Sequence, residues 1–565
     1  MPIQLSPGVN VSEIDLTTVV PNVGASAGAF VGPFQWGPMN KIYTIASEVD
    51  LVNQFGKPNS DVYEYWFSAA NFLAYGNTLR VVRAKTYGAL NSTANGSGLL
   101  VQNDDDYDAN HSTYGDGTYG NTGGWAGRFA GELGNSLLVS MADANTWNVW
   151  PYRTSFTAVP NTSPYVAARG GANDEIHIVV VDEDGLWSGT KGTILEKYPF
   201  VSKASDAKDD SGNSNYYKEV VSRKSLYVWP LSHPTNLGTG TAWGSTANVT
   251  AYKLLTSNCS NSLSGGVTST NTNYTSAITQ GWDYFNNKET VDVSLLVTGT
   301  GNSTIANYVI DNIAITRQDC VAFVSPEKAD VVDNYNNEDT DIIEFRNTLT
   351  STSYAFLDSG YKYQYDKYAD TYRWVPLNGD MAGLCVRTDS VLDPWYSPGG
   401  LNRGQIKNVV KLAWNPNKTK RDNLYQSSVN PVVQFPGDGT VLFGDKTLLA
   451  KPSAFDRINV RRLFIVLEKA ISRAARFSLF EFNDEFTRAQ FVALVEPFLR
   501  DVKGRRGITD FKVVCDDSNN TGEVIDRNEF VGDIYIKPSR SINFIQLNFI
   551  AVRTGVSFNE VVGAV

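Results

Sequence analysis

The strongest hydrophobic periodicity in the chain lies in its last quarter, residues 456–565. Apolar residues recur there at offsets of three and four, which is the spacing of one face of an amphipathic helix. A first stripe runs over 460–474, with Asp456 in position to cap it. A second runs over 491–502, and we expect its helix to begin at Thr487, which starts the pattern of a capping box. Pro497 lies inside the second stripe, so we expect a kink or an early end there.

Strands follow these two helices. Residues 508–515 and 533–537 alternate apolar and polar positions, 541–552 are longer and apolar, and Pro538 should end the middle strand. Two helices over a few strands make a small sheet with exposed edges, and exposed edges pair with other chains. The residues that we assign to that edge are Ile534, Ile536, Phe544 and Leu547.

The pattern predicts further elements earlier in the chain. Val9 and Val11 alternate with polar residues in an extended segment that has no neighbour in sequence to pair with, so it must join a sheet elsewhere, in its own chain or in another. We expect buried strands within 21–37 and at 78–84, 291–297 and 320–324, helices at 47–55, 63–75 and 303–316, a hairpin or meander at 354–376, and irregular connectors at 381–404 and 434–447. The strand–helix–strand unit over 291–324 is right-handed by default.

Composition changes at about residue 89. Residues 89–173 and 202–284 are rich in Asn, Ser, Thr, Gly and Asp, with tryptophans that need a core to pack in, so we expect folded surface insertions. The fold class is therefore α+β and multidomain, with an α/β middle domain, β-rich outer insertion domains and a C-terminal helix–helix–sheet domain. The predicted domains are residues 1–20, 21–88, 89–175, 176–345, 346–440 and 441–565, of which 21–88 and 346–440 form one discontinuous domain.

Charge singles out one region. The chain has 565 residues and a formal net charge of -11, yet residues 457–506 hold eleven Lys or Arg and six acids. This is either a solvated helix face or a surface for an acidic protein partner. Nucleic acid is disfavoured because the whole chain is acidic and no aromatic–basic reading motif accompanies the patch. The candidate surface consists of Arg457, Arg461, Arg462, Arg473 and Arg476.

Motifs with catalytic chemistry are weak. Residues 115–120 match a dinucleotide-binding fingerprint but follow an acidic run, and the match needs a strand before it and a helix after it. Residues 439–447 resemble a P-loop, but Asp445 separates the glycine from the lysine and puts negative charge where phosphates would lie. The acidic run 104–108 lacks the central glycine of an EF-hand loop. We therefore expect no enzyme activity, no cofactor and no metal site.

Cysteine usage and the termini point to a cytoplasmic site of synthesis. Cys259, Cys320, Cys385 and Cys515 are far apart in sequence and match neither a disulfide scaffold nor a zinc ligand set, so we expect free thiols. The N-terminus lacks the basic and apolar regions of a signal peptide. No run approaches the roughly 18 apolar residues that span a bilayer, so we expect no membrane insertion.

Several short stretches together carry a resemblance to a known family. The chain resembles the tail sheath proteins of contractile-tailed bacteriophages, closest to the large T4-like type, and the resemblance leaves roughly 89–284 uncovered. The stretches are Pro7–Asp15, Gly28–Gly32 with Gly37 and Pro38, Phe55–Gly56, Gly379–Asp389 with Pro394, Trp395 and Gly404, Phe480–Asp484, Cys515–Thr521 and Asp533–Pro538.

This resemblance implies a structural protein of the virion, made in the host cytoplasm. Six subunits would form a ring, the rings would stack helically around a tail tube, and contraction would drive the tube through the host envelope for genome delivery. It implies homo-oligomers, the tail tube protein, and baseplate and tail terminator proteins as partners. Arms from neighbouring subunits would add strands to the inner sheet, which assigns Val9, Val11, Glu13 and Ile14 to an intersubunit arm. The basic helices would face the tube.

A different class of function stays open. The tryptophans of the insertions are also typical of a virion-surface protein that binds carbohydrate or a receptor.

Overall fold

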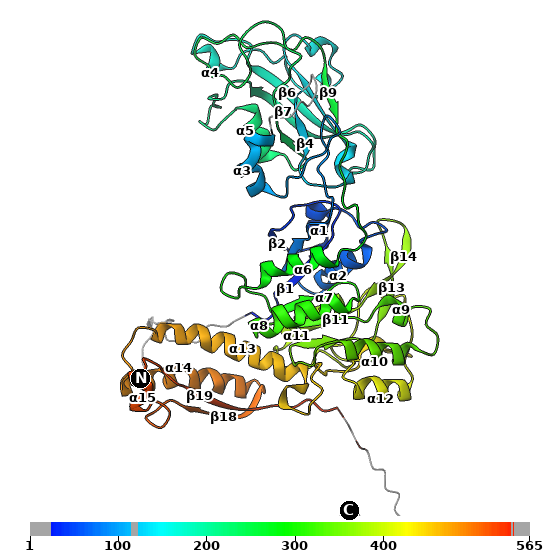
Figure 1. The fold of residues 1–565 in the computed structure, drawn as a ribbon, viewed down its shortest axis with the longest axis vertical. Coiled ribbons are helices and arrows are strands. Elements are labelled where there is room, and N and C mark those ends of the chain that lie inside the picture. Colours follow the sequence, from blue (N-terminus) through cyan, green and yellow to red (C-terminus); the bar gives the residue numbers. More distant parts are fainter. Residues whose placement is uncertain (1–23, 115–122, 544–545, 547–565) are drawn as a thin grey trace, which may run out of the picture. The chain divides into compact units, whose positions relative to one another are not determined.

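The computed structural model describes residues 24–114, 123–543 and 546 (Figure 1). These residues form two compact units, which are described separately. The larger unit contains residues up to 394 and residues 398–473. The smaller unit contains residues 395–397 and the residues from 474 onward.

A six-stranded sheet lies at the centre of the larger unit. Five strands run parallel and β2 pairs antiparallel at one edge. Almost every residue in the five parallel strands is buried, because a parallel sheet is covered on both faces and its strands are apolar throughout. The order is β12 (Ala355–Leu357), β11 (Val321–Val324), β10 (Leu295–Val297), β1 (Gly28–Gly32), β3 (Leu79–Arg83) and β2 (Ile42–Ile45).

Helices cover both faces of this sheet. α2 (Tyr63–Leu73) and α11 (Asn378–Val391) pack together against β1 and β10, and α6 (Thr275–Trp282) packs against β1 and β3. Gly28 lies against Phe72 of α2, whereas Val31 lies against Gly281 of α6. Even and odd residues of β1 therefore face different helices, as the strand period of two requires.

The predicted strand–helix–strand unit is present, with β10 and β11 parallel. Its helix is continuous from Ser303 to Arg317, as α7 (Ser303–Tyr308), a π-helical stretch (Val309–Ala314) and α8 (Ile315–Arg317). The other helices of this region are α1 (Glu48–Phe55), α9 (Lys328–Val331), α10 (Glu338–Thr348), α12 (Lys418–Gln426) and α13 (Ile458–Ala475), whose last two residues belong to the smaller unit.

Two hairpins follow the sheet. β13 (Tyr361–Asp366) pairs with β14 (Thr371–Pro376) and with the short β15 (Lys411–Leu412), which confirms the predicted hairpin. The predicted connectors were wrong in part, since only residues 392–404 and 443–447 of them are irregular. Residues 381–404 begin inside the buried helix α11, and 434–447 overlap the hairpin β16 (Val432–Phe435) with β17 (Gly439–Leu442). The helix α11 was missed because its glycines resemble turn residues in sequence, whereas Gly379 and Gly383 allow close packing inside the helix.

The insertion forms its own sheet and core. Its strands are β5 (Leu137–Ala142), β6 (Glu175–Asp182), β7 (Thr193–Ser202) and β9 (Cys259–Ser262), in the order β7-β6-β5-β9. The predicted boundary at residue 175 therefore falls inside one sheet, because β5 pairs with both β6 and β9. Its other elements are β4 (Trp125–Gly127), β8 (Val228–Pro230), α3 (Asp104–Tyr114), α4 (Pro164–Ala167) and α5 (Tyr217–Lys224).

The smaller unit consists of one long helix over a two-stranded sheet. α14 (Glu485–Gly504) packs on β18 (Ile508–Val514), which pairs antiparallel with β19 (Asp533–Pro538). A short helix, α15 (Gly522–Asp526), lies between the strands in sequence. Short 3-10 turns complete the described chain at Glu132–Ser136, Trp147–Val149, Arg153–Ser155, Asp283–Phe285, Ala454–Asp456 and Arg476–Ser478.

The two strands were predicted correctly, but the details of α14 were not. Asp484 caps the helix by accepting a hydrogen bond from the amide of Thr487, so the helix begins before Thr487. Pro497 neither ends nor divides it. Proline removes one backbone hydrogen bond, but the buried contacts of Val495, Leu499 and Val502 hold the helix on both sides of it.

Candidate functional site

The outer edges of the β18–β19 sheet are the first candidate surface. Ile534 pairs with Val513 and Ile536 with Phe511. Among the described residues each strand pairs on one side only, so each outer edge offers backbone groups to a further strand. The other residues assigned to assembly, Val9, Val11, Glu13, Ile14, Phe544 and Leu547, lie outside the described part of the chain.

The sheet is held in place by α14. Phe491, Val495 and Leu499 are buried on its inner side, and Arg488 binds the carboxylate of Asp517 at 2.6 Å. Arg488 comes from the helix and Asp517 from the loop after β18, so this ion pair fixes the loop at the start of the helix. Trp395 closes the other end, where its indole nitrogen donates to the carbonyl of Arg505 at 3.1 Å.

Two of the five predicted surface arginines are not on a surface. Arg462 is 2% exposed and binds both carboxylate oxygens of Asp389, at 2.6 and 2.8 Å. Arg461 is 5% exposed, donates to the hydroxyl of Tyr354 at 3.0 Å and stacks on Phe455. Their assignment to an exposed basic surface was wrong. A charge count along the sequence does not show that a carboxylate 73 positions away lies beside Arg462.

The remaining three arginines differ in how far they are engaged. Arg457 is half-buried and lies 3.4 Å from the carboxylates of both Asp445 and Asp456. Arg473 is exposed and binds Asp292 at 2.6 Å. Arg476 is exposed at the end of α13. Arg473 and Arg476 are therefore the members of the series that a partner can reach.

An apolar patch that the periodicity did not predict lies between α13 and α14. Phe480 is 106% exposed and Phe482 is 85% exposed, and Phe480 has a positive φ of 71°. Exposed apolar patches on this scale mark interaction surfaces. The available signal was the presence of five large apolar residues within ten positions. The patch consists of Phe477, Leu479, Phe480, Phe482 and Phe486.

Of the two glycine motifs, only residues 439–447 lie in the described part of the chain, and they lack phosphate-binding geometry. Residues 439–447 begin in a hairpin strand, where a P-loop needs a strand followed by a helix. Residues 115–120 lie outside the described part, and the acidic run before them is the helix α3, not a strand.

A third glycine-containing loop lies where related folds bind ligands, but its polar groups are hydrogen-bonded to other side chains of the protein. Residues 298–302 join β10 to α7 at the carboxyl edge of the parallel sheet, beside the point where the strand order reverses. Related sheets bind ligands in that crevice. Here the amide of Gly301 donates to the hydroxyl of Tyr361 at 3.3 Å, and Thr300 donates to the carboxylate of Glu64 at 2.7 Å.

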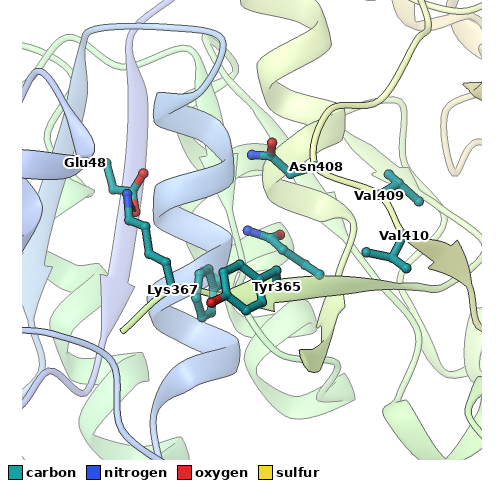
Figure 2. Close-up of a pocket in the computed structure, with 8 residues that line it drawn as sticks. Glu48, Tyr365, Lys367, Asn408, Val409 and Val410 are labelled. Atoms are coloured by element: carbon teal, nitrogen blue, oxygen red, sulfur yellow. Dashed lines mark ion pairs between the residues drawn. The ribbon is translucent and has the colours of Figure 1, made fainter. Parts of the chain in front are cut away.

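One surface cavity of about 410 Å³ lies beside the first hairpin (Figure 2). Glu48 and Lys367 form an ion pair of 3.1 Å at its rim, and Val409 and Val410 line the opposite side. Its other lining residues are Phe67, Gln364, Tyr365 and Asn408. None of its lining residues is a cysteine, serine or histidine, so the lining contains no Ser–His or Cys–His pair.

The tryptophans of the insertion do not form a binding face. Trp125, Trp150, Trp229 and Trp243 are at most 3% exposed and belong to the insertion's internal cores. Trp147 and Trp187 are partly buried and pack against those cores. The observation that suggested a carbohydrate binder is thus explained by packing.

The described residues contain no metal-ligand cluster, no membrane-spanning helix and no disulfide. They contain no group of three or more metal-ligating side chains, and none of their helices is long and apolar enough to cross a membrane. The four cysteines are all buried, and no disulfide joins them.

Comparison with family models finds three matches. Residues 268–448 match the model described as phage tail sheath protein central domain. Residues 450–551 match the phage tail sheath C-terminal domain. Residues 29–84 match the tail sheath protein Gp18 domain III N-terminal region. The insertion separates the last of these matches from the first.

Similar proteins cover the whole chain. A tail sheath protein of Vibrio phage KVP40 is 34% identical over 99% of this chain and 100% of its own length. A tail sheath protein of Enterobacteria phage T4 is 35% identical over 99% of both chains. Among solved structures, a sheath tail protein from Listeria innocua matches 92% of each chain at 10% identity with a TM-score of 0.52. The contracted helical sheath of the anti-feeding prophage matches 97% of this chain and 99% of that one, at 11% identity and a TM-score of 0.50. Both solved structures therefore have the same fold as this chain.

Proposed function

Because this chain belongs to the tail sheath protein family, whose members are structural components of the virion, we propose that six copies form a ring and that such rings stack around a tail tube. Contraction of the stack then drives the tube through the host envelope. Baseplate and tail terminator proteins bound the stack at its ends, and synthesis takes place in the host cytoplasm.

The observation that carries this proposal is the pair of open edges on the β18–β19 sheet. A two-stranded sheet is marginal by itself, and among the described residues this one pairs with no third strand and packs on α14. The segment that contains Val9 and Val11 has the alternation of a strand and joins the sheet of another copy by β-augmentation. Each added backbone hydrogen bond contributes only about 0.5–1.5 kcal/mol, but every copy in a ring repeats the set.

Point substitutions in the arm test this part of the proposal. Val9→Asp with Val11→Asp places two charges on the face that would be buried, so we expect folded monomers that form no rings on tail tubes in negative-stain images. Asn10→Asp with Ser12→Asp is the matched control, because those positions alternate with the valines and face solvent. Normal rings from the valine variant would refute the role of the arm.

The tube is the second proposed partner. Arg473 and Arg476 are the exposed members of the arginine series and face an acidic tube on this proposal. Arg473→Glu with Arg476→Glu should abolish co-sedimentation with purified tubes at physiological salt while leaving the fold intact. Arg223→Glu with Arg153→Glu reverses two exposed arginines of the insertion and should change nothing. Equal binding by both variants would remove the tube from this surface.

A further inference from the structure

The smaller unit is electrically polarised along α14. At the start of this helix, residues 476–491 and 515–533 contain nine carboxylates and three arginines, and we call this the acidic end. At its finish, residues 496–510 and 537–540 contain six lysines and arginines and three carboxylates, and we call this the basic end. A helix of 20 residues is about 30 Å long, so the two ends are well separated.

The contacts inside the unit fix which loops lie at which end. The Arg488–Asp517 ion pair and the hydrogen bond from Asn483 to the carbonyl of Glu529, at 2.8 Å, bring the loop before β19 to the start of α14. At the other end Ile508 pairs with Pro538, and Lys503 binds Asp510 at 3.1 Å. Figure 1 shows α15 at the start of α14.

The exposed apolar patch belongs to the acidic end. Phe477, Phe480, Phe482 and Phe486 lie among Glu481, Asp484 and Glu485 and are all at least 70% exposed. All six cations of the basic end are exposed in the isolated chain. Aromatic rings attract cations over their faces, and the carboxylates beside them attract the same cations. The two ends of this unit are therefore complementary to each other, and one unit cannot join its own ends.

We propose that the acidic end of one copy docks onto the basic end of a second copy, head to tail. Such a contact is heterologous, and heterologous contacts generate rings or helical arrays. The inference rests on the proposed function, because it names a surface through which the copies of a sheath associate. It differs from strand addition, since it uses side chains at the ends of α14 and no arm.

Charge reversal at either end tests the contact with the full chain. Glu481→Lys with Asp526→Lys removes most of the net negative charge of the acidic end, and Arg500→Glu with Arg506→Glu reverses the sign of the net charge of the basic end. All four side chains are exposed. Sedimentation velocity across a concentration series should show association of the unchanged protein at low salt and less at high salt. Each variant alone should associate about tenfold more weakly. An equimolar mixture of the two should recover association, because the unchanged basic end of the first variant then meets the unchanged acidic end of the second.

Two further variants separate the causes. Phe480→Ala with Phe482→Ala should weaken association without removing its salt dependence. Glu183→Lys with Asp210→Lys changes the same number of exposed charges in the insertion and should have no effect. Circular dichroism of every variant verifies the fold.

Three results would overturn the inference. These are an unchanged protein that is monomeric at every concentration, reversal variants that associate as the unchanged protein does, and a mixture that recovers nothing. If the variants still form rings on tail tubes like the unchanged protein, the proposed function stands and only this contact is refuted.

Discussion

The larger and the smaller unit differ in where their charged and apolar side chains lie. In the larger unit, Lys362 and Asp380 are both fully buried and bind each other at 2.9 Å, and Arg462 is neutralised by Asp389. In the smaller unit, several phenylalanines are exposed and the two ends carry net charges of opposite sign. The larger unit pairs these groups within one chain, and on our proposal the exposed groups of the smaller unit contact other copies. Stability should thus depend on interior pairs in one unit, and association on surface groups in the other.

The largest expected effect is on the buried ion pair. Arg462→Ala leaves the carboxylate of Asp389 in a site where burial already raises its pKa. Breaking a buried pair in this way costs about 3–5 kcal/mol, measured as a loss in the free energy of unfolding by denaturant titration. The matched change in the smaller unit, Arg500→Ala, removes an exposed arginine whose nearest carboxylate is 3.6 Å away, so it should stay within about 0.5 kcal/mol. Equal losses would abolish the contrast.

A smaller effect is expected from adding one methyl group. A Cβ at Gly379 of α11 would collide with the backbone carbonyl oxygen of Ser68 in α2, so Gly379→Ala should cost about 1–3 kcal/mol. Gly522 begins α15 in the smaller unit and has open space around it. Gly522→Ala should therefore be neutral or slightly stabilising. Thermal unfolding of the two variants checks both, and an unaffected Gly379→Ala would mean that the α2–α11 contact is loose.

The smallest effect is in the pH dependence, where the two units should have opposite signs. Burial, with the charges of Glu327, Asp341 and Glu344, raises the pKa of Asp330 to about 6. The folded state then holds this proton more tightly than the unfolded state, so stability falls as pH rises from about 4 to about 6. Asp330→Asn should remove that fall.

Asp484 is the counterpart in the smaller unit. Hydrogen bonds from Thr487 lower the pKa of Asp484 below 3.8, so its contribution is present above pH 4 and is lost as pH falls through the lowered pKa. Asp484→Asn should flatten only the acid side of the curve. The free energy of unfolding is measured against pH for both variants. If both substitutions changed the pH dependence in the same direction, the opposite pKa shifts of Asp330 and Asp484 would be contradicted.

Local patterns predicted the elements whose signals are local. β1, α1, β3 and β18 follow directly from patterns of neighbouring residues. The cap of α1 is also local, since the hydroxyl of Ser47 accepts a hydrogen bond from the amide of Asp50 at 3.1 Å. α11 was missed because its buried face is built around glycines that read as turn residues. The limits of the insertion were missed because β5 finds β6 and β9 only after long loops. No local pattern contains that pairing.

The candidate surface was harder to predict for a related reason. Arg461 and Arg476 look alike in sequence, yet one stacks on Phe455 inside the protein and the other is exposed. Helical periodicity places a residue on a face but does not say what covers that face. The apolar patch at 477–486 lies between the two helical stripes in sequence, so the density of large apolar residues was the signal for it.

The filled crevice at the carboxyl edge of the parallel sheet has a consequence for the source of mechanical work. Many α/β proteins hold a nucleotide at this edge and use its turnover to change shape. Here Tyr361 and Glu64 accept hydrogen bonds from the loop after β10. On the proposed function, the free energy of contraction is therefore stored in the contacts between copies when the assembly is built, and each assembly releases it once.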